Sequence, residues 1–408
     1  MKILFVSQHY RPEPFRLSDI CEDLVERGHE VTVLTGIPNY PEGKTYADYR
    51  NNKNRRETIE GVTVFRSYTI PRGKSTLHRI LNYFSFAISS SIGVLLGQYK
   101  AKDGSEFDCI FVNQSSPVMM AWAGMAYKNK YKKPLFLYCM DVWPDSLTVG
   151  GVKQDGLIFK LFKFISKKVY RASDYIFVTS PSFKNYFVKQ FDILEQKITY
   201  LPQYAEDLFI PDESKVNKES VDLTFAGNIG KAQNLETILK AASLIEKNAD
   251  LPKKIHFHFV GDGTELLRMK ALAYELELKN VSFYGRRSLE EMPTFYKKSD
   301  AMLVSLIGDS IVSRTIPGKV QSYMAAGKPI IGAISGDTKI IVEEAKCGFV
   351  SPEQDVEQLA QNICEFSMLS VEEQKELGKQ ARYYYEKHFS KEQFMTQLEN
   401  YLREEFSS

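Results

Sequence analysis

Residues 309–332 form the segment of the sequence whose residue types and spacing most clearly predict chemistry. A polar loop precedes Pro317, which suits the first turn of a helix, and Gly327 ends that helix before an apolar strand. Backbone N–H groups at a helix start attract anions, and Arg314 and Lys319 add positive charge. The segment therefore predicts a socket for a diphosphate, with a helix that only packs as the alternative. Its candidate residues are Ser313, Arg314, Thr315, Pro317, Gly318, Lys319, Gln321 and Ser322.

Two glycine-containing turns follow expected strands in the same half of the chain. Gly227 and Gly230 lie in a turn before a helix, where a phosphate can approach the backbone closely, although a plain strand-to-helix turn has the same pattern. The second turn contains Asp262, whose charge would repel a phosphate and suits a ribose or base edge. Arg286 follows a third strand, either in a solvated loop or as a clamp for a base or phosphate. The candidates in these turns are Gly227, Asn228, Lys231, Gly261, Asp262, Gly263 and Arg286.

Short apolar runs alternate with helix-length stretches along the whole chain, which is typical of parallel sheets covered by helices. We expect a helix at 17–28, ended by Gly28. In the first half, strands are expected at 2–7, 30–35, 62–68, 109–112, 135–139, 175–179 and 198–201. In the second half, they are expected at 222–226, 255–260, 281–284, 301–306, 329–332 and 348–350.

Residues 201–220 lie between the two sets of strands, are rich in proline and polar residues, and have no periodicity, which indicates a linker. The sequence therefore predicts an N-terminal domain at 1–200, a C-terminal domain at 221–386, and a final helix at 387–408 that can pack back on the first domain. Each domain is expected to be an α/β, Rossmann-like, doubly wound parallel sheet, with a cleft between the two. Ligands of such sheets bind at the carboxyl ends of the strands, where the candidate residues lie.

The two halves of the chain carry opposite charge. Hydrophobic residues at 43% and charged residues at 25% are ordinary values, which exclude a disordered protein. The formal net charge is +2, but residues 1–200 carry 28 Lys/Arg against 19 Asp/Glu, whereas residues 201–408 carry 25 against 32. The halves therefore stand at +9 and −7. The basic half indicates an anionic partner, and charge alone leaves nucleic acid, a membrane surface and a phosphorylated substrate open.

The five cysteines are odd in number and form no C-x-x-C pair, so we expect reduced thiols of a cytosolic protein. No signal peptide is expected, because the first apolar run is short and leads directly into a polar loop. Residues 80–98 are uncharged but contain serines and Asn82, and are too polar for a spanning helix. Their apolar residues recur at helical spacing on one face, which either packs on the core or touches a bilayer interface. These residues are Leu81, Phe84, Ile88, Ile92 and Leu95.

Taken together, these motifs resemble the family 4 glycosyltransferases of the two-domain GT-B fold, specifically the WbuB-like enzymes of bacterial O-antigen and capsule assembly. The resemblance covers almost the whole chain. It rests on Pro12-Glu-Pro-Phe, on the segments 27–43, 141–147 and 316–327, and on Gly227 and Gly261.

The resemblance implies transfer of a sugar, with retention at the anomeric carbon, from a UDP-sugar of the N-acetylhexosamine type. It implies a lipid-diphosphate-linked saccharide as acceptor. The two glutamates that usually hold the donor correspond to Arg314 and Ser322 here, and the usual Arg and Lys that grip the diphosphate correspond to Asn228 and Gln233. The positive charge is then expected from Lys231, Arg314 and Lys319.

The resemblance also places Asp141 beside the reacting sugar, where relatives often carry His-Asp, although Asp141 could instead cap the next helix. Catalytic roles are expected for Asp141, Arg314 and Lys319. The loops that end the strands of the first domain supply the acceptor-side candidates, each of which could also be an ordinary loop residue. These candidates are His9, Glu13, Arg16, Asn39 and Tyr40.

The expected protein is a cytoplasmic enzyme peripherally associated with the inner face of the plasma membrane, with an anionic membrane surface and no nucleic acid as partner. The sequence offers no D-x-D pair and no His/Cys cluster, so no metal and no other cofactor is expected. Two other function classes remain open. One is a nucleotide-sugar epimerase or hydrolase on the same fold, and the other is a binding protein that holds UDP-sugars without reacting them.

Overall fold

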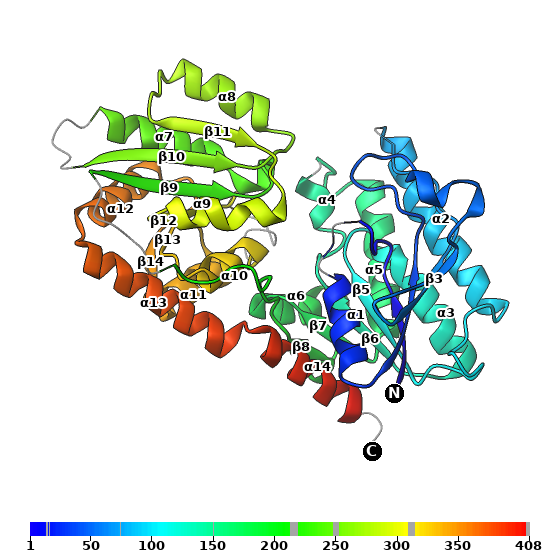
Figure 1. Cartoon of the computed structure of the whole chain (residues 1–408). Coiled ribbons are helices and arrows are strands. Elements are labelled where there is room, and N and C mark those ends of the chain that lie inside the picture. Colours follow the sequence, from blue (N-terminus) through cyan, green and yellow to red (C-terminus); the bar gives the residue numbers. More distant parts are fainter. Residues whose placement is uncertain are drawn as a thin grey trace. The chain divides into compact units, whose positions relative to one another are not determined.

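The computed structural model describes residues 1–13, 15, 17–73, 75–149, 151–212, 219–247, 253–308 and 315–404. The chain divides into two compact units (Figure 1). Unit 1 consists of Met1–Leu201 and Met395–Ser408, and unit 2 consists of Pro202–Phe394. Each unit is a mainly parallel sheet covered by helices, which confirms the expected fold class.

The sheet of unit 1 has eight strands in the order β3-β4-β2-β1-β5-β6-β7-β8. Apolar residues fill its central strands, which are buried on both faces, as a parallel sheet covered by helices requires. The edge strand β3 pairs antiparallel with β4 and was not expected from the sequence. The strands are β1 (Lys2–Val6), β2 (Glu30–Thr35), β3 (Arg56–Ile59), β4 (Val62–Arg66), β5 (Cys109–Gln114), β6 (Leu135–Cys139), β7 (Tyr175–Val178) and β8 (Ile198–Tyr200).

The helices of unit 1 connect these strands and cover the sheet. The first, at Leu17–Glu26, ends before Gly28, which has a positive φ of 86° and so confirms the expected glycine end. The α-helices are α1 (Leu17–Glu26), α2 (Thr76–Leu95), α3 (Trp122–Tyr131), α4 (Ser146–Val149), α5 (Leu157–Ala172), α6 (Pro181–Phe191) and α14 (Lys391–Glu404). Short 3₁₀ turns are η1 (Ala47–Asn52), η2 (Val118–Ala121) and η3 (Glu195–Lys197).

Helix α2 turns its apolar stripe away from the core of unit 1. A different face packs inward: Phe86, Ala87 and Val94 are buried together with Asn82, which accepts a hydrogen bond from Gln8 Nε2 at 2.7 Å and donates to the Ile70 carbonyl at 2.6 Å. A buried amide satisfied in this way fixes the face of the helix that packs. The interpretation in which the stripe packs on the core is therefore wrong for most of its members. We call the exposed apolar residues of this helix the α2 stripe: Leu77, Ile80, Leu81, Ile88, Ile92 and Leu95.

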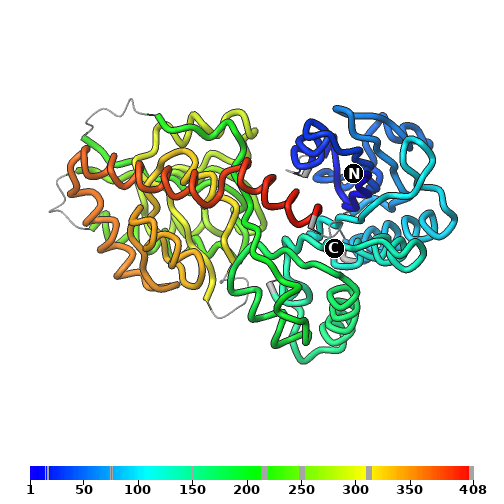
Figure 2. Tube along the Cα trace, turned by 90° about the horizontal axis from the view of Figure 1, so that it is seen from below, coloured from blue at the N-terminus to red at the C-terminus, as the bar shows by residue number. Residues whose placement is uncertain are grey.

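The last helix, α14, belongs mainly to unit 1. The Glu399 carboxylate lies 2.8 Å from His29 Nε2 and 3.2 Å from Arg27, and the Tyr401 ring lies 5.4 Å from that of Phe177. The beginning and the last described turns of the chain are thus in the same unit, as the trace in Figure 2 shows.

Unit 2 contains six parallel strands in the order β11-β10-β9-β12-β13-β14. Its strands are β9 (Ser220–Ala226), β10 (Lys254–Val260), β11 (Val281–Gly285), β12 (Ala301–Ser305), β13 (Ile330–Ala333) and β14 (Gly348–Ser351). Its α-helices are α7 (Leu235–Glu246), α8 (Leu266–Glu275), α9 (Met292–Lys298), α10 (Gly318–Ala325), α11 (Gly336–Glu344), α12 (Val356–Met368) and α13 (Val371–His388). Its 3₁₀ turns are η4 (Lys231–Gln233) and η5 (Leu289–Glu291). All six expected strands are present, and the described residues 356–404 are mainly helical, as expected.

Candidate active site

The two glycine turns of unit 2 lie against each other at the carboxyl ends of β9 and β10. Gly227 and Gly261 have φ values of 132° and 147°, which residues with a side chain rarely adopt. Gly227 N donates to the Val260 carbonyl at 2.9 Å, and a Cβ added at Gly261 would collide with the Gly227 carbonyl oxygen. Both positions therefore require glycine to bring the turns into contact, independently of any ligand.

The residues that follow the glycines extend this contact. Ile229 N donates to the Asp262 carbonyl at 2.9 Å, and Gly263 N donates to the Asp262 side chain at 2.8 Å. A Cβ at Gly263 would collide with the Ile229 carbonyl. The side chains of Asn228 and Asp262 remain exposed, as a ligand-contacting position requires.

Lys319, in the first turn of α10, extends toward these turns. Its ammonium lies 3.7 Å from the centre of the Phe225 ring and donates to Gln233 Oε1 at 3.0 Å. A Cβ on Gly227 would lie 3.3 Å from its Nζ. No carboxylate among the described residues forms an ion pair with Lys319. The ammonium therefore reaches Gln233, one of the two positions that the family resemblance matched to a diphosphate-gripping cation.

Burial lowers the pKa of Lys319 to about 7, because the charged form loses water without gaining a carboxylate partner. A neighbouring ring and an amide oxygen stabilise the cation only weakly compared with an anion. Near neutral pH a bound anion such as a diphosphate can therefore stabilise the charged form of Lys319, which the protein alone stabilises poorly.

The other candidates of this segment support α10 or lie outside the described residues. Pro317 precedes the helix as its N-cap residue, so the expected first-turn position is off by one residue, while Gly327 follows its end as expected. Gln321 and Ser322 are buried, and Ser322 Oγ donates to the Gly318 carbonyl at 3.3 Å. The Thr315 carbonyl accepts a hydrogen bond from Thr338 at 2.8 Å. The candidates Ser313 and Arg314 lie outside the described residues.

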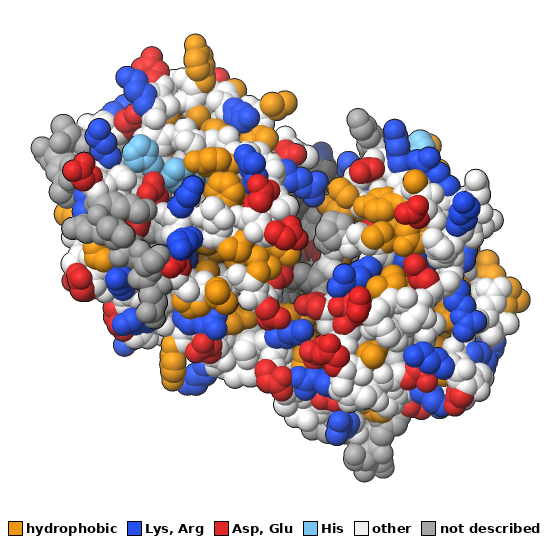
Figure 3. Space-filling view, viewed as in Figure 1, with side chains coloured by type: hydrophobic (Ala, Val, Ile, Leu, Met, Phe, Trp, Pro, Cys, Tyr) orange, Lys and Arg blue, Asp and Glu red, His pale blue; other side chains and the backbone are white. Residues whose placement is uncertain are grey.

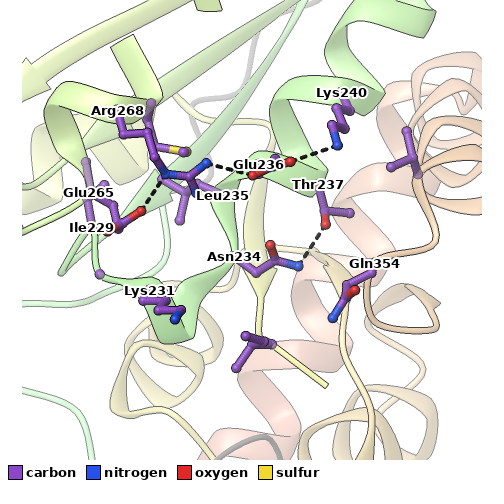
Figure 4. A pocket seen from close by; sticks show the side chains of 14 residues that line it. Ile229, Lys231, Asn234, Leu235, Glu236, Thr237, Lys240, Glu265, Arg268 and Gln354 are labelled. Carbon is purple, nitrogen blue, oxygen red and sulfur yellow. Dashed lines mark hydrogen bonds and ion pairs between the residues drawn. The ribbon is translucent and has the colours of Figure 1, made fainter. Parts of the chain in front are cut away.

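A pocket of about 350 Å³ opens beside Gly230, Lys231 and Asn234 (Figure 4). Its charged walls are paired with each other: Glu236 binds Lys240 at 2.7 Å and Arg268 at 2.8 Å. Lys231 is exposed at its rim, and Arg286 is exposed just beyond β11. The ion pair between Glu236 and Arg268 joins the start of α7 to the start of α8.

In unit 1, Glu13 joins two of the loops that contain acceptor-side candidates. One carboxylate oxygen accepts from the backbone N–H groups of Asn39 and Tyr40, at 2.8 and 2.7 Å. The other lies 3.0 Å from His9 Nδ1, and both His9 and Glu13 are buried. Because a carboxylate only accepts, Nδ1 carries the proton and Nε2 presents a lone pair in the neutral ring.

Aromatic rings surround this pair. The His9 ring stacks on Phe15 at 4.7 Å and lies 5.7 Å from Tyr40, while Arg72 N donates to Asn39 Oδ1 at 2.9 Å. The structure thus brings His9, Glu13, Asn39 and Tyr40 together. Arg16 lies outside the described residues.

Asp141 lies two residues after the end of β6. Its carboxylate accepts from Ser116 Oγ, which in turn accepts from Trp143 Nε1 at 2.9 Å. Burial raises the pKa of Asp141 above its usual range, against hydrogen bonds from Ser116, Ser146 and Trp143 that lower it. These partners are side chains, and α4 begins only at Ser146, so the helix-cap interpretation of Asp141 lacks support.

Several supporting residues escaped the sequence analysis. Ser116 lies 25 residues along the chain from Asp141, and no local pattern marks it. Asp145 could have been noticed in the sequence, because it is a second aspartate in the segment Asp141-Val-Trp-Pro-Asp145. Burial raises its pKa to about 6, and its carboxylate accepts from Tyr186.

Within the described residues, no cluster of His, Cys, Asp and Glu could hold a metal ion. In the same part of the chain, no helix is long and apolar enough to cross a membrane. The visible face carries lysines, arginines and carboxylates dispersed among apolar side chains (Figure 3).

Comparison with known proteins gives matches over nearly the whole chain. Residues 16–203 match the model of glycosyltransferase family 4, and residues 207–384 match that of the group 1 glycosyl transferases. WcaI of Escherichia coli K12, a glycosyl transferase assigned to colanic acid biosynthesis, is 26% identical over 354 residues, which cover 80% of this chain and 82% of the relative.

Solved structures show the same fold. Sucrose-phosphate synthase from Thermosynechococcus elongatus aligns with a TM-score of 0.76 at 17% identity, over 100% of this chain and 99% of its own. HepE from Anabaena, solved with UDP and glucose, aligns with a TM-score of 0.70 at 16% identity, over 99% of this chain and 100% of its own. With family models matched on both units and this fold, the chain belongs to the family 4 glycosyltransferases of the GT-B fold.

Proposed function

We propose that this glycosyltransferase moves a sugar of the N-acetylhexosamine type from a UDP-sugar to a hydroxyl of a lipid-diphosphate-linked saccharide in bacterial surface polysaccharide assembly. The observation that carries the donor part is Lys319, an ammonium beside two glycine turns that forms no ion pair among the described residues. The name of WcaI, which refers to colanic acid biosynthesis, supports a role in surface polysaccharide assembly. The structure of HepE, solved with UDP, supports UDP as the nucleotide of the donor.

The donor diphosphate lies against Lys319 and the glycine turns of unit 2, and Arg314 is expected from the sequence to contribute as well. The uracil and ribose lie toward Asp262 and Arg286. As the bond between the anomeric carbon and the diphosphate breaks, negative charge grows on the phosphate oxygens, where the ammonium stabilises it. Binding the leaving group this strongly is the main catalytic contribution.

Retention at the anomeric carbon follows from attack on the face that the diphosphate leaves. The acceptor hydroxyl forms the new bond to the anomeric carbon, and its proton passes to an oxygen of the departing diphosphate. Asp141 holds the reacting sugar, and the His9–Glu13 pair orients the acceptor. No step in this reaction requires a metal, since the cationic charge comes from side chains.

The acceptor is membrane-bound, so we place the enzyme on the inner face of the plasma membrane as a peripheral protein. The α2 stripe and exposed cations near it supply the contact. Two cations of unit 1 are already engaged: Arg55 donates to the Arg66 carbonyl and to Asn52, and Arg72 lies over the Tyr40 and Tyr83 rings. Lys53 and Arg79 are exposed and suit the role better, whereas the guanidinium of Arg56 lies 5.0 Å from the centre of the Phe65 ring.

Incubation of the purified protein with a panel of UDP-sugars, with and without lipid-linked acceptors, tests this function. UDP release that requires the acceptor supports transfer. Donor consumption without an acceptor would instead favour the epimerase or hydrolase, and UDP binding without any reaction would favour the binding protein.

A further inference from the structure

Helix α5 exposes four large apolar side chains within its first two turns. Leu157, Ile158, Leu161 and Phe164 are 84%, 59%, 55% and 58% exposed. We call these four residues the α5 patch. Single exposed apolar residues are common, but a group on one face of a helix marks an interaction surface.

The exposure follows from how the helix packs. Phe159, Ser166, Val169 and Tyr170 point inward and are buried, and the Tyr170 ring packs on Phe187 of α6 at 4.6 Å. The inward face is therefore already filled. Rotating the helix to cover the α5 patch would expose these buried rings, so the patch needs a partner outside unit 1.

The charge of α5 indicates which kind of partner. The helix contains no Asp or Glu and five cations, Lys160, Lys163, Lys167, Lys168 and Arg171. Three of these cations bind side chains at the end of α6: Lys163 donates to Gln190, and Lys167 and Arg171 pair with Asp192.

Lys160 and Lys168 are exposed and pair with no carboxylate of the described residues. The Lys168 ammonium lies 4.4 Å from the Phe164 ring centre, at the edge of the α5 patch. Apolar side chains bordered by such cations match the boundary between acyl chains and anionic headgroups, where lysines reach outward while their neighbours insert.

We propose that the α5 patch docks on the surface of an anionic bilayer, as a second contact beside the α2 stripe. Helices α2 and α5 both pack against η2 and α3, so they cover the same face of the sheet. This inference rests on the proposed membrane association and adds a surface that the sequence analysis did not assign.

Vesicle binding of the full chain tests the proposal, with phosphatidylglycerol-containing vesicles compared with pure phosphatidylcholine. Leu161→Ser/Phe164→Ser should weaken binding to anionic vesicles by about tenfold per side chain. Lys160→Glu/Lys168→Glu should weaken it by about fivefold or more per residue, and the effect should fade as salt rises.

Matched controls lie on unit 2. Leu267→Ser/Tyr274→Ser removes apolar residues of α8 that are 80% and 87% exposed, and Lys270→Glu/Lys375→Glu makes the same charge change at exposed positions. Both control variants should bind vesicles like the wild type. All variants should keep the wild-type melting temperature and oligomeric state.

The outcomes separate this inference from the proposed function. If the wild type binds anionic vesicles and the α5 variants bind equally well, the α5 inference is wrong while the membrane association stands. If the wild type binds no vesicles at low salt, both are wrong. A change of oligomeric state in the α5 variants, with vesicle binding intact, would assign the patch to a second copy of the chain instead.

Discussion

Lys319 should make UDP binding depend on pH in a way that no other described residue of the donor site can. Its pKa is lowered to about 7 in the free protein, and a bound diphosphate restores the charge and raises that pKa. Binding above neutral pH therefore takes up a proton. Since the free protein loses this proton as pH rises through about 7, affinity should already be falling at pH 7 and should fall further above it.

The size of the effect follows from the same linkage. If the pKa of Lys319 in the complex lies well above 9, the dissociation constant of UDP rises by up to about 50-fold between pH 7 and pH 9. Lys319→Met should bind weakly with little pH dependence over this range. Lys319→Arg should also lose the dependence while keeping measurable affinity, because a guanidinium stays charged.

Isothermal titration calorimetry in buffers of different ionisation enthalpy measures both the dissociation constant of UDP and the number of protons taken up on binding. At pH 8 the wild type should take up close to one proton per UDP, and both variants close to none. In transfer assays, Lys319→Ala should lower activity by a factor on the order of 30 to 1000, for the loss of about 2 to 4 kcal/mol. Equal proton uptake in wild type and Lys319→Met would refute the assignment of the charge to Lys319.

Three other substitutions test the rest of the site. Asp141→Asn should lower the transfer rate by about 100-fold while leaving UDP affinity unchanged, so a matching loss of UDP affinity would place Asp141 elsewhere in the reaction. Glu13→Gln should raise the acceptor KM by about tenfold with an unaltered donor KM, measured by varying each substrate in turn; an effect on the donor alone would contradict the acceptor role. Gly261→Ala should destabilise the protein by about 3 kcal/mol or more in urea unfolding, whereas Gly104→Ala, with positive φ but open space around it, should cost only about 1 kcal/mol. Similar losses for the two alanine variants would mean that the contact with Gly227 is not what demands glycine.

The sequence predicted the elements of the fold well because its apolar runs are short, regular and bounded by turn residues. Strand β3 escaped, since Arg56–Ile59 lies at the edge of the sheet and contains three polar residues and a single apolar one. The sequence also did not predict that the α2 stripe is exposed to solvent. Periodicity identified one apolar face of the helix, but the face that packs inward contains Phe86, Ala87 and Val94 with the hydrogen-bonded Asn82.

For the candidate site, local patterns located the glycine turns but not the contacts between distant residues. The need for glycine at Gly261 comes from the Gly227 carbonyl of the neighbouring turn, and the partner of Lys319 is Gln233, on a different element. The basic, acid-free pattern of α5 was present in the sequence. Its meaning became clear only when the exposed positions were known.

The central claim is that unit 2 alone holds the UDP part of the donor without a metal. The most direct test is UDP binding to the isolated segment Pro202–Phe394, with and without EDTA, after circular dichroism has shown that it is folded. The segment should bind UDP with the affinity of the full chain, and EDTA should leave that affinity unchanged. A folded segment that binds no UDP, or binds it only when a divalent cation is present, would contradict the claim.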